Sequence, residues 1–321
     1  MALELCLEIG QVVHNSMAEW SDYLKIVANP ISENSHEWWH CCVSGRFPWR
    51  RFYSESEPRW TALDDDVKSR TTLVEGSAHS EDSVRVLLHA AGPKPEAIVF
   101  SIGFASPDGF LDTMKMIVSG SKNSPPELCC RGMTVLLKVL SENYPGYNPK
   151  PKLVVISSAG IGKEALKVAP STLRILSKIA PPRGYDDRLA MEVSLANALV
   201  PPHATSSPLP RFFPSSSEVS PHILAPETLA ALPSGFIDPV DVCVLRPASF
   251  TDGPARGITK VRGDGGYRLR QEGKESEGKG MSTISRTDVG GFVAALLRSG
   301  DSDEEGAAAK KWWGHQVVLA Y

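Results

Sequence analysis

The stretch that most limits the possible folds is Lys152–Gly160, with the sequence KLVVISSAG. Residues 153–156 are apolar without polar alternation, which is typical of a strand buried on both faces of a sheet. In parallel α/β sheets, ligands bind at the carboxyl ends of such strands. Ser157 and Ser158 end the run, so we expect their hydroxyl groups at that edge. Another interpretation leaves them as hydroxyls that satisfy backbone groups where the strand ends.

Strand and helix patterns alternate on both sides of this stretch from residue 71 onward. Helices are expected after Ser80, over residues 133–140 and 186–199, and after the Ser285–Asp288 capping box. Further strands are expected at residues 72–75, 97–102, 240–245 and 316–321. This alternation predicts an α/β fold with a doubly wound, mostly parallel sheet and helices on both faces.

Three segments of this region have weaker patterns. Residues 161–185 are interpreted as loop with a short helix at 173–179. Residues 200–239 are rich in proline and serine, which predicts a surface insertion that is partly disordered. Glycine-rich residues 263–280 are expected to form a hairpin or loop.

Residues 1–70 predict no regular element clearly. Ile9 to Val27 suits an amphipathic helix, whereas Leu3 to Ile9 alternates as a strand does, and the two overlap. We expect an irregular segment in place of a first strand, helix and second strand. Residues 71–321 would form the folded domain.

Composition excludes several classes of protein. The 321 residues are 42% hydrophobic and carry a net charge of −3, which argues against a nucleic-acid binder or a basic membrane-surface protein. No apolar run reaches the roughly 18 residues of a membrane helix. Acidic residues among the first nine argue against a signal peptide. The six cysteines include two adjacent pairs, which do not suit a disulfide framework. We expect a reducing, cytoplasmic location and a small-molecule partner, with the oligomeric state left open.

Several pieces of the chain, taken in order, resemble the atypical short-chain dehydrogenases, the NmrA-like NAD(P)-binding Rossmann proteins. The pieces are Thr72–Gly76, Ala97–Gly103, Leu153–Ser158, Asp186–Glu192, Val244–Gly253 and Ile284–Val289. Over residues 71–321 the resemblance implies a Rossmann-like fold with NADP or NAD as cofactor. It also implies an NAD(P)H-dependent oxidoreductase that acts on a small carbonyl-type metabolite.

The resemblance further implies roles for single residues. Ser158 matches the position from which catalytic members polarise a carbonyl, and Ser157 is the neighbouring alternative. Tyr185 would donate a proton, although an aromatic side chain at a helix entry is the other interpretation. Arg188 stands where many members carry a lysine that holds the ribose, but a guanidinium cannot act as a deprotonated amine. The residues implied in cofactor binding are Gly76, Ser77, Ser101, Ile102, Gly103, Ser157, Arg188 and Pro247.

One departure from the family lies in the first 70 residues. A dinucleotide fold begins with a glycine-rich turn that lets the backbone approach the pyrophosphate. Here Gly10 stands alone and the next glycine is Gly45. Cofactor binding is then lost, or takes another form, or this N-terminus is not the one that relatives carry. A non-catalytic dinucleotide sensor or interaction module of the same fold is therefore the alternative function.

A separate motif suggests a remote third function. His36-Glu37-Trp-Trp-His40 matches H-E-x-x-H, which on a helix binds zinc through both histidines with the glutamate as general base. A chance match in an irregular segment is the simpler interpretation, and we assign no metal ligands.

Overall fold

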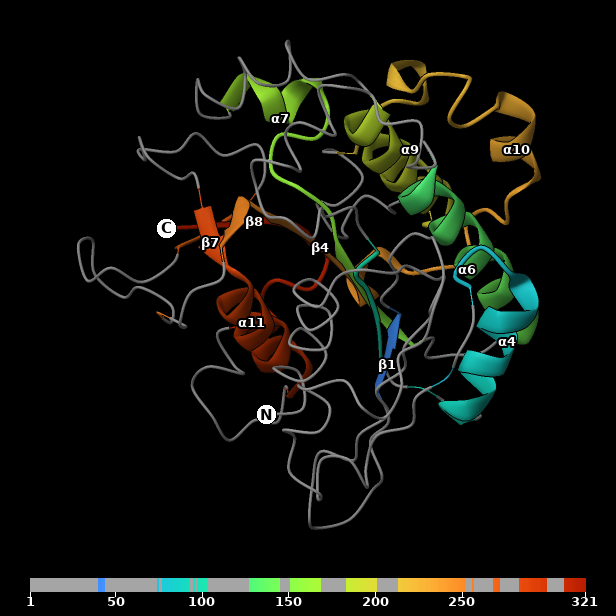
Figure 1. The fold of residues 1–321 in the computed structure, drawn as a ribbon, viewed down its shortest axis with the longest axis horizontal. Helices are drawn as coiled ribbons and strands as arrows, with labels where there is room; N and C mark the ends of the chain where they lie inside the picture. Colours follow the sequence, from blue (N-terminus) through green and yellow to red (C-terminus); the bar gives the residue numbers. More distant parts are fainter. Residues whose placement is uncertain are drawn as a thin grey trace, which may run out of the picture.

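The computed structural model describes residues 40–43, 74, 77–92, 95, 97–102, 127–144, 151–168, 183–200, 213–251, 256, 268–271, 283–298 and 309–321. Their main feature is a six-stranded sheet in the order β1-β2-β3-β4-β8-β6 (Figure 1). The strands are β1 (His40–Val43), β2 (Ala97–Phe100), β3 (Lys152–Ile156), β4 (Val242–Pro247), β8 (His315–Ala320) and β6 (Arg268–Gln271). Neighbouring strands are parallel except for the antiparallel pair β6–β8. The predicted doubly wound, mostly parallel α/β fold is confirmed.

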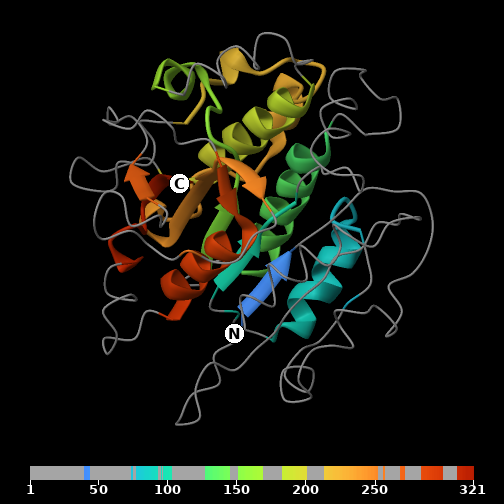
Figure 2. The same cartoon turned by 60° about the vertical axis from the view of Figure 1, so that its left-hand side comes forward.

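Helices cover both faces of this sheet (Figure 2). On one face lie α4 (Glu81–Ala90), α6 (Leu128–Asn143) and α9 (Arg183–Ala198), and on the other lies α11 (Arg286–Arg298). Val155 and Val244 pack toward the first group, whereas Val154 and Leu245 pack toward α11. The apolar run of β3 thus fills two cores, as expected of a strand buried on both faces. Among the described helices, none is both long and apolar enough to cross a membrane.

Two helices start at the serines that the sequence indicated. Ser80 is the N-cap of α4 and accepts the Ser83 N–H at 3.3 Å. Ser285 precedes α11 and accepts the Asp288 N–H at 3.0 Å. Both caps satisfy N–H groups that a helix leaves without an internal partner, which is why the chain enters the helix there.

Elsewhere the structure differs from the expectations. Residues 40–43 form β1, so the first 70 residues contribute a strand beside β2. Residues 268–271 form β6 rather than part of a local hairpin or loop, because their partner is β8. Helix α7 (Lys163–Val168) occupies residues that were expected to be loop. The helix predicted at 173–179 lies outside the described residues, as does the strand predicted at 72–75 apart from Val74.

Much of the proline- and serine-rich insertion is folded. It contains the short helices η2 (Ser216–Glu218), α10 (Pro226–Ala231) and η3 (Pro239–Asp241). Val219 and Leu224 pack against α9 residues Leu189 and Val193. Residues 213–239 are thus folded, because their few apolar side chains cover α9. Residues 201–212 lie outside the described residues, so partial disorder of the insertion stays a prediction.

A second, smaller sheet lies beyond the end of β4. It pairs β5 (Ser249–Thr251) with β7 (Thr283–Ser285) in parallel. Since β7 leads directly into α11, this pair positions the start of that helix. The Tyr321 N–H donates to the Thr283 carbonyl at 2.9 Å, which ties the small sheet to the residue after β8.

Candidate active site

The carboxyl ends of β2, β3 and β4 meet at one edge because these strands are parallel neighbours. The pairing continues past the end of β3. The Ser157 N–H donates to the Leu245 carbonyl at 2.7 Å, and the Ala159 N–H donates to the Pro247 carbonyl at 3.0 Å. Ser158 therefore lies between two residues fixed to β4, at the edge where open parallel sheets bind ligands.

The two serines at this edge have different surroundings. Ser157 is 3% exposed, and its hydroxyl donates to Oε1 of Glu192 at 2.5 Å. Ser158 is less buried, and successive residues of an extended chain point to opposite faces. Ser158 thus has the more accessible hydroxyl, whereas the hydrogen of the buried Ser157 hydroxyl is already donated to Glu192.

Tyr185 lies over the loop that follows β3. Its hydroxyl oxygen accepts the Gly162 N–H at 2.8 Å. Gly162 has a φ of +87°, a conformation that glycine adopts without strain, so the loop can turn its N–H toward α9. Burial raises the pKa of Tyr185 above its ordinary value. The phenol stays protonated at neutral pH, and its hydrogen can be donated to another acceptor.

Asp187 holds the amino end of α6. Its two carboxylate oxygens accept the N–H groups of Cys129 and Cys130, each at 2.8 Å. The N-cap residue Glu127 makes no side-chain cap bond within the described part of the chain. Asp187 thus caps α6 from a neighbouring helix, and burial raises its pKa to about 6.

Arg188 lies beside this cap. Burial raises the pKa of the Asp187 carboxyl and of the Cys129 thiol, and the positive charge of Arg188 lowers both pKa values in opposition. The Cys129 thiol donates to the Ile102 carbonyl at 3.3 Å. Arg188 is therefore near the carboxyl end of β2, the end at which the resemblance implies a cofactor.

A buried ion pair lies behind Ser157. Glu192 and Arg246 are each 0% exposed and share two contacts, one of them from Arg246 Nε to Oε1 at 3.1 Å and the other from Nη2 to Oε2. Gln316 Nε2 donates to Oε2 of the same carboxylate at 3.4 Å. Strands β4 and β8 and the residue directly after β3 thus each direct one polar side chain to a single residue of α9.

The folded part of the insertion also reaches this loop. Glu218 Oε2 accepts the Lys163 N–H at 3.0 Å, one residue after the amide that bonds to Tyr185. Glu218 is fixed in turn by a capping box with Ser215. Its negative charge adds to the burial that raises the Tyr185 pKa. Residues 215–218 therefore cover the side of the loop next to Tyr185.

The other described residues implied in cofactor binding lie before α4, after β2 and at the end of β4. Ser77 accepts the His79 N–H at 3.2 Å in the turn that precedes α4. Ile102 is 2% exposed, and a Cβ placed on Gly132 would lie 2.7 Å from its Cδ1, so its side chain belongs to the core. Ser101 is partly buried after β2, and Pro247 is buried at the end of β4. Gly76 and Gly103 lie outside the described residues.

The structure does not support the helix that the zinc motif requires. His40 begins strand β1 and pairs with Ala97, whereas both histidines would have to lie on one helical face. His36 and Glu37 lie outside the described residues. Within the ranges that the structure covers, no group of three or more His, Cys, Asp or Glu side chains is placed to hold a metal ion.

Glu192, Arg246 and Asp187 have no role among the residues predicted from the sequence. The sequence does contain a signal for Glu192 and Arg246. Glu192 lies within an otherwise apolar run of α9, and Arg246 follows the apolar residues of β4. A single acid and a single base in two buried segments predict a buried pair, because an isolated buried charge is too costly.

Comparisons with known proteins show a likeness to solved structures. No family model matches the chain, and the curated proteins gave no match. ChuY from Escherichia coli O157:H7, described as an anaerobillin reductase, is 13% identical, with a TM-score of 0.38 over 77% of this chain and 73% of that one. The oxidoreductase ylbE from Lactococcus lactis is 10% identical, with a TM-score of 0.40 over 78% and 72% of the two chains. Such values do not bear on activity, and the fold assignment depends on the sheet itself.

Proposed function

We propose that this chain is an NAD(P)-dependent oxidoreductase that acts on a small carbonyl substrate at the carboxyl edge of its parallel sheet. One observation carries the proposal. The Tyr185 hydroxyl is bonded to the Gly162 N–H, in the same short loop that carries Ser158. A phenol and a serine hydroxyl at the ligand-binding edge form a pair that can polarise and protonate a carbonyl oxygen.

The residues at this edge fit a nicotinamide nucleotide in their donor chemistry. The hydroxyl of Ser101 and the guanidinium of Arg188 complement ribose hydroxyls and phosphate oxygens. When bound, the reduced nicotinamide would supply the hydride. Tyr185 would give its proton to the carbonyl oxygen, and Ser158 would donate a hydrogen bond to that same oxygen. Burial favours the protonated phenol at neutral pH.

A titration combined with a turnover assay tests this function. NADPH and NADH are added separately to the purified chain, and binding is followed by fluorescence and thermal shift. Turnover is followed at 340 nm with 9,10-phenanthrenequinone as the carbonyl probe. We expect binding of at least one nucleotide and measurable turnover, with Tyr185→Phe losing about 100-fold or more in kcat.

The control for this substitution is Tyr144→Phe. Tyr144 follows α6 and is buried in the core, so the control loses a hydroxyl without touching the edge. It should keep kcat within about twofold of the wild type. Full activity in Tyr185→Phe would overturn the catalytic assignment.

A non-catalytic dinucleotide sensor is the second candidate. The observation in its favour is the position of Arg188, which stands where the resemblance implies a lysine and lies beside Asp187. A guanidinium holds a phosphate or ribose well, but it cannot lose its proton during turnover. Nucleotide binding without turnover of any carbonyl probe would favour the sensor over the oxidoreductase.

A further inference from the structure

The loop Ser157–Gly162, which carries Ser158, is attached to α9 at both of its ends. At the first end, the Ser157 hydroxyl donates to Glu192. At the second end, the Gly162 N–H donates to the Tyr185 hydroxyl. Tyr185 and Glu192 are seven residues apart on one helix, which is two turns, and therefore lie on the same face.

Further bonds fix the backbone between these two points. The Ser157 and Ala159 N–H groups pair with β4, and the Lys163 N–H is held by Glu218. Gly160 has a φ of +80°, which lets the chain turn back onto α9 within a few residues. Ser158 thus lies in a segment whose flanking residues are held by sheet, helix and insertion together.

The Glu192 carboxylate is itself held from three sides. Arg246 from β4 and Gln316 from β8 donate to it in addition to Ser157. A fully buried ion pair contributes little net stability compared with apolar side chains of the same size. Its directional bonds do, however, fix how α9 is rotated and how far it is shifted along the sheet, which apolar contacts do less strictly.

We propose that α9 acts as a clamp on this loop, and that the Ser157–Glu192 bond is the positioning contact that sets the Ser158 hydroxyl against the Tyr185 phenol. This rests on the proposed oxidoreductase function, because it assigns Ser158 and Tyr185 to one carbonyl oxygen. Ser157 and Glu192 touch no reacting atom in this arrangement. They act through the loop and the helix that carry the reacting groups.

The test compares two buried serines that each lose one hydroxyl. Ser157→Ala breaks the clamp but leaves Glu192 with Arg246 and Gln316. Ser194→Ala is the matched control, because Ser194 is fully buried on α9 and donates to the Ala190 carbonyl at 2.9 Å. Ser157→Thr restores a hydroxyl at the first position and serves as the rescue variant.

Two readouts are measured, kinetics and hydrogen exchange. With NADPH and 9,10-phenanthrenequinone, Ser157→Ala should lose about 10- to 100-fold in kcat, since a small displacement of reacting groups is costly. Its KM for NADPH should stay within about twofold, and Ser194→Ala should keep both values. Amide exchange over residues 158–163 should become about tenfold faster in Ser157→Ala alone. Ser157→Thr should recover most of kcat and of the protection.

The possible outcomes distinguish a failure of the clamp from a failure of the proposed oxidoreductase function. Unchanged exchange in Ser157→Ala overturns the clamp, whether or not the chain is an enzyme. Faster exchange with unchanged kcat overturns the positioning role of Ser157. If the wild type binds NADPH but turns over no probe, the oxidoreductase assignment fails, while the exchange result still decides whether α9 holds the loop.

Discussion

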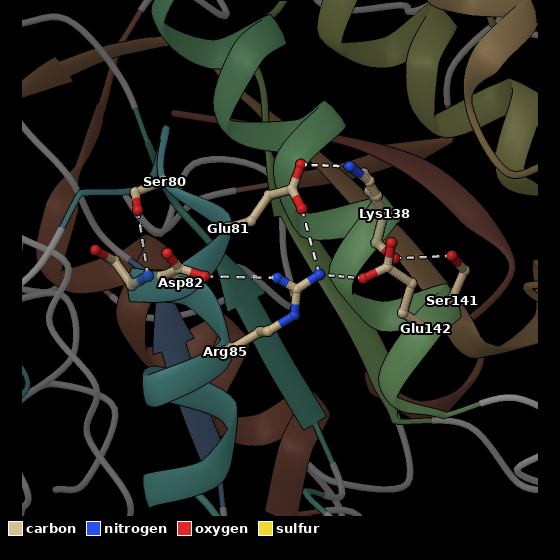
Figure 3. A network of polar contacts seen from close by, with 8 residues as sticks. Ser80, Glu81, Asp82, Arg85, Lys138, Ser141 and Glu142 are labelled. Atoms are coloured by element: carbon tan, nitrogen blue, oxygen red, sulfur yellow. Dashed lines mark hydrogen bonds and ion pairs between the residues drawn. The ribbon is translucent and has the colours of Figure 1, made fainter.

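Ion pairs join separate elements beneath α9 and on the surface between α4 and α6. Beneath α9, Glu192 and Arg246 are completely buried. Between α4 and α6 the charged groups are 35–48% exposed and bridge two neighbouring helices (Figure 3). The surface cluster consists of Glu81, Arg85, Lys138 and Glu142.

The two clusters use the same chemistry under different conditions. On the surface, Lys138 lies 2.6 Å from Glu81 and Arg85 lies 3.2 Å from the same carboxylate, but water screens both attractions. Beneath α9 no water competes, so each charge depends on its partner. Exposure, more than distance, should therefore decide how much each pair matters.

The largest expected effect is the loss of one partner from the buried pair. Glu192→Ala leaves the Arg246 guanidinium buried without its carboxylate, and it also frees Ser157. We expect the free energy of unfolding to fall by about 3–5 kcal/mol, measured by urea denaturation.

The double variant Glu192→Met with Arg246→Met isolates the cause. Both charges are then replaced by apolar side chains, so most of the lost stability should return. The helix would nevertheless lose its directional bonds to the sheet. If Glu192→Ala alone lowers the free energy of unfolding by less than about 1 kcal/mol, the contrast between the two clusters is contradicted.

Asp187 is a third case, because this buried carboxylate is held mainly by N–H groups and not by an ion pair. Burial raises its pKa to about 6, compared with an ordinary value of 3.8, while the Cys129 and Cys130 N–H groups limit the shift. The folded chain therefore binds this proton more tightly than the unfolded chain. Stability should fall as pH rises from about 4 to about 6, by about 3 kcal/mol from this group.

The measurement is urea denaturation of the wild type and of Asp187→Asn across this pH range. As the Asp187 carboxyl ionises, the free energy of unfolding of the wild type should fall by about 3 kcal/mol relative to that of Asp187→Asn. Asp82→Asn is the control, since it removes a carboxylate that is 98% exposed on α4. A difference that moves the other way would mean that the cap outweighs burial.

The elements that positioned the candidate site were largely predictable, because their signals are local. The apolar run 153–156 predicted β3, and Ser80 and Ser285 predicted the starts of α4 and α11. By contrast, the four-residue strands β1 (HCCV) and β6 (RLRQ) lack a run of large apolar residues. Short strands of that kind depend on tertiary pairing more than on their own pattern.

The candidate site was predictable in its residue types but not in its contacts. Ser158 and Tyr185 could be selected from the sequence, yet periodicity does not show that Tyr185 bonds to Gly162. Nor does it show that Ser157 turns inward to Glu192. Such contacts depend on how α9 is rotated against the sheet, and that rotation is set by side chains from β4, from β8 and from the loop after β3 at once.

The smallest expected effect belongs to the exposed cluster. Arg85→Ala removes the contacts with Glu81 and Glu142, and Lys138→Ala removes the second contact with Glu81. Each variant should shift the midpoint of thermal unfolding by no more than about 2 °C, because hydration replaces most of the lost attraction. In 1 M NaCl even this shift should vanish, whereas the effect of Glu192→Ala should persist, since salt does not reach a buried pair. If a surface variant destabilises the chain as much as Glu192→Ala does, then burial does not decide how much a charged pair contributes to stability.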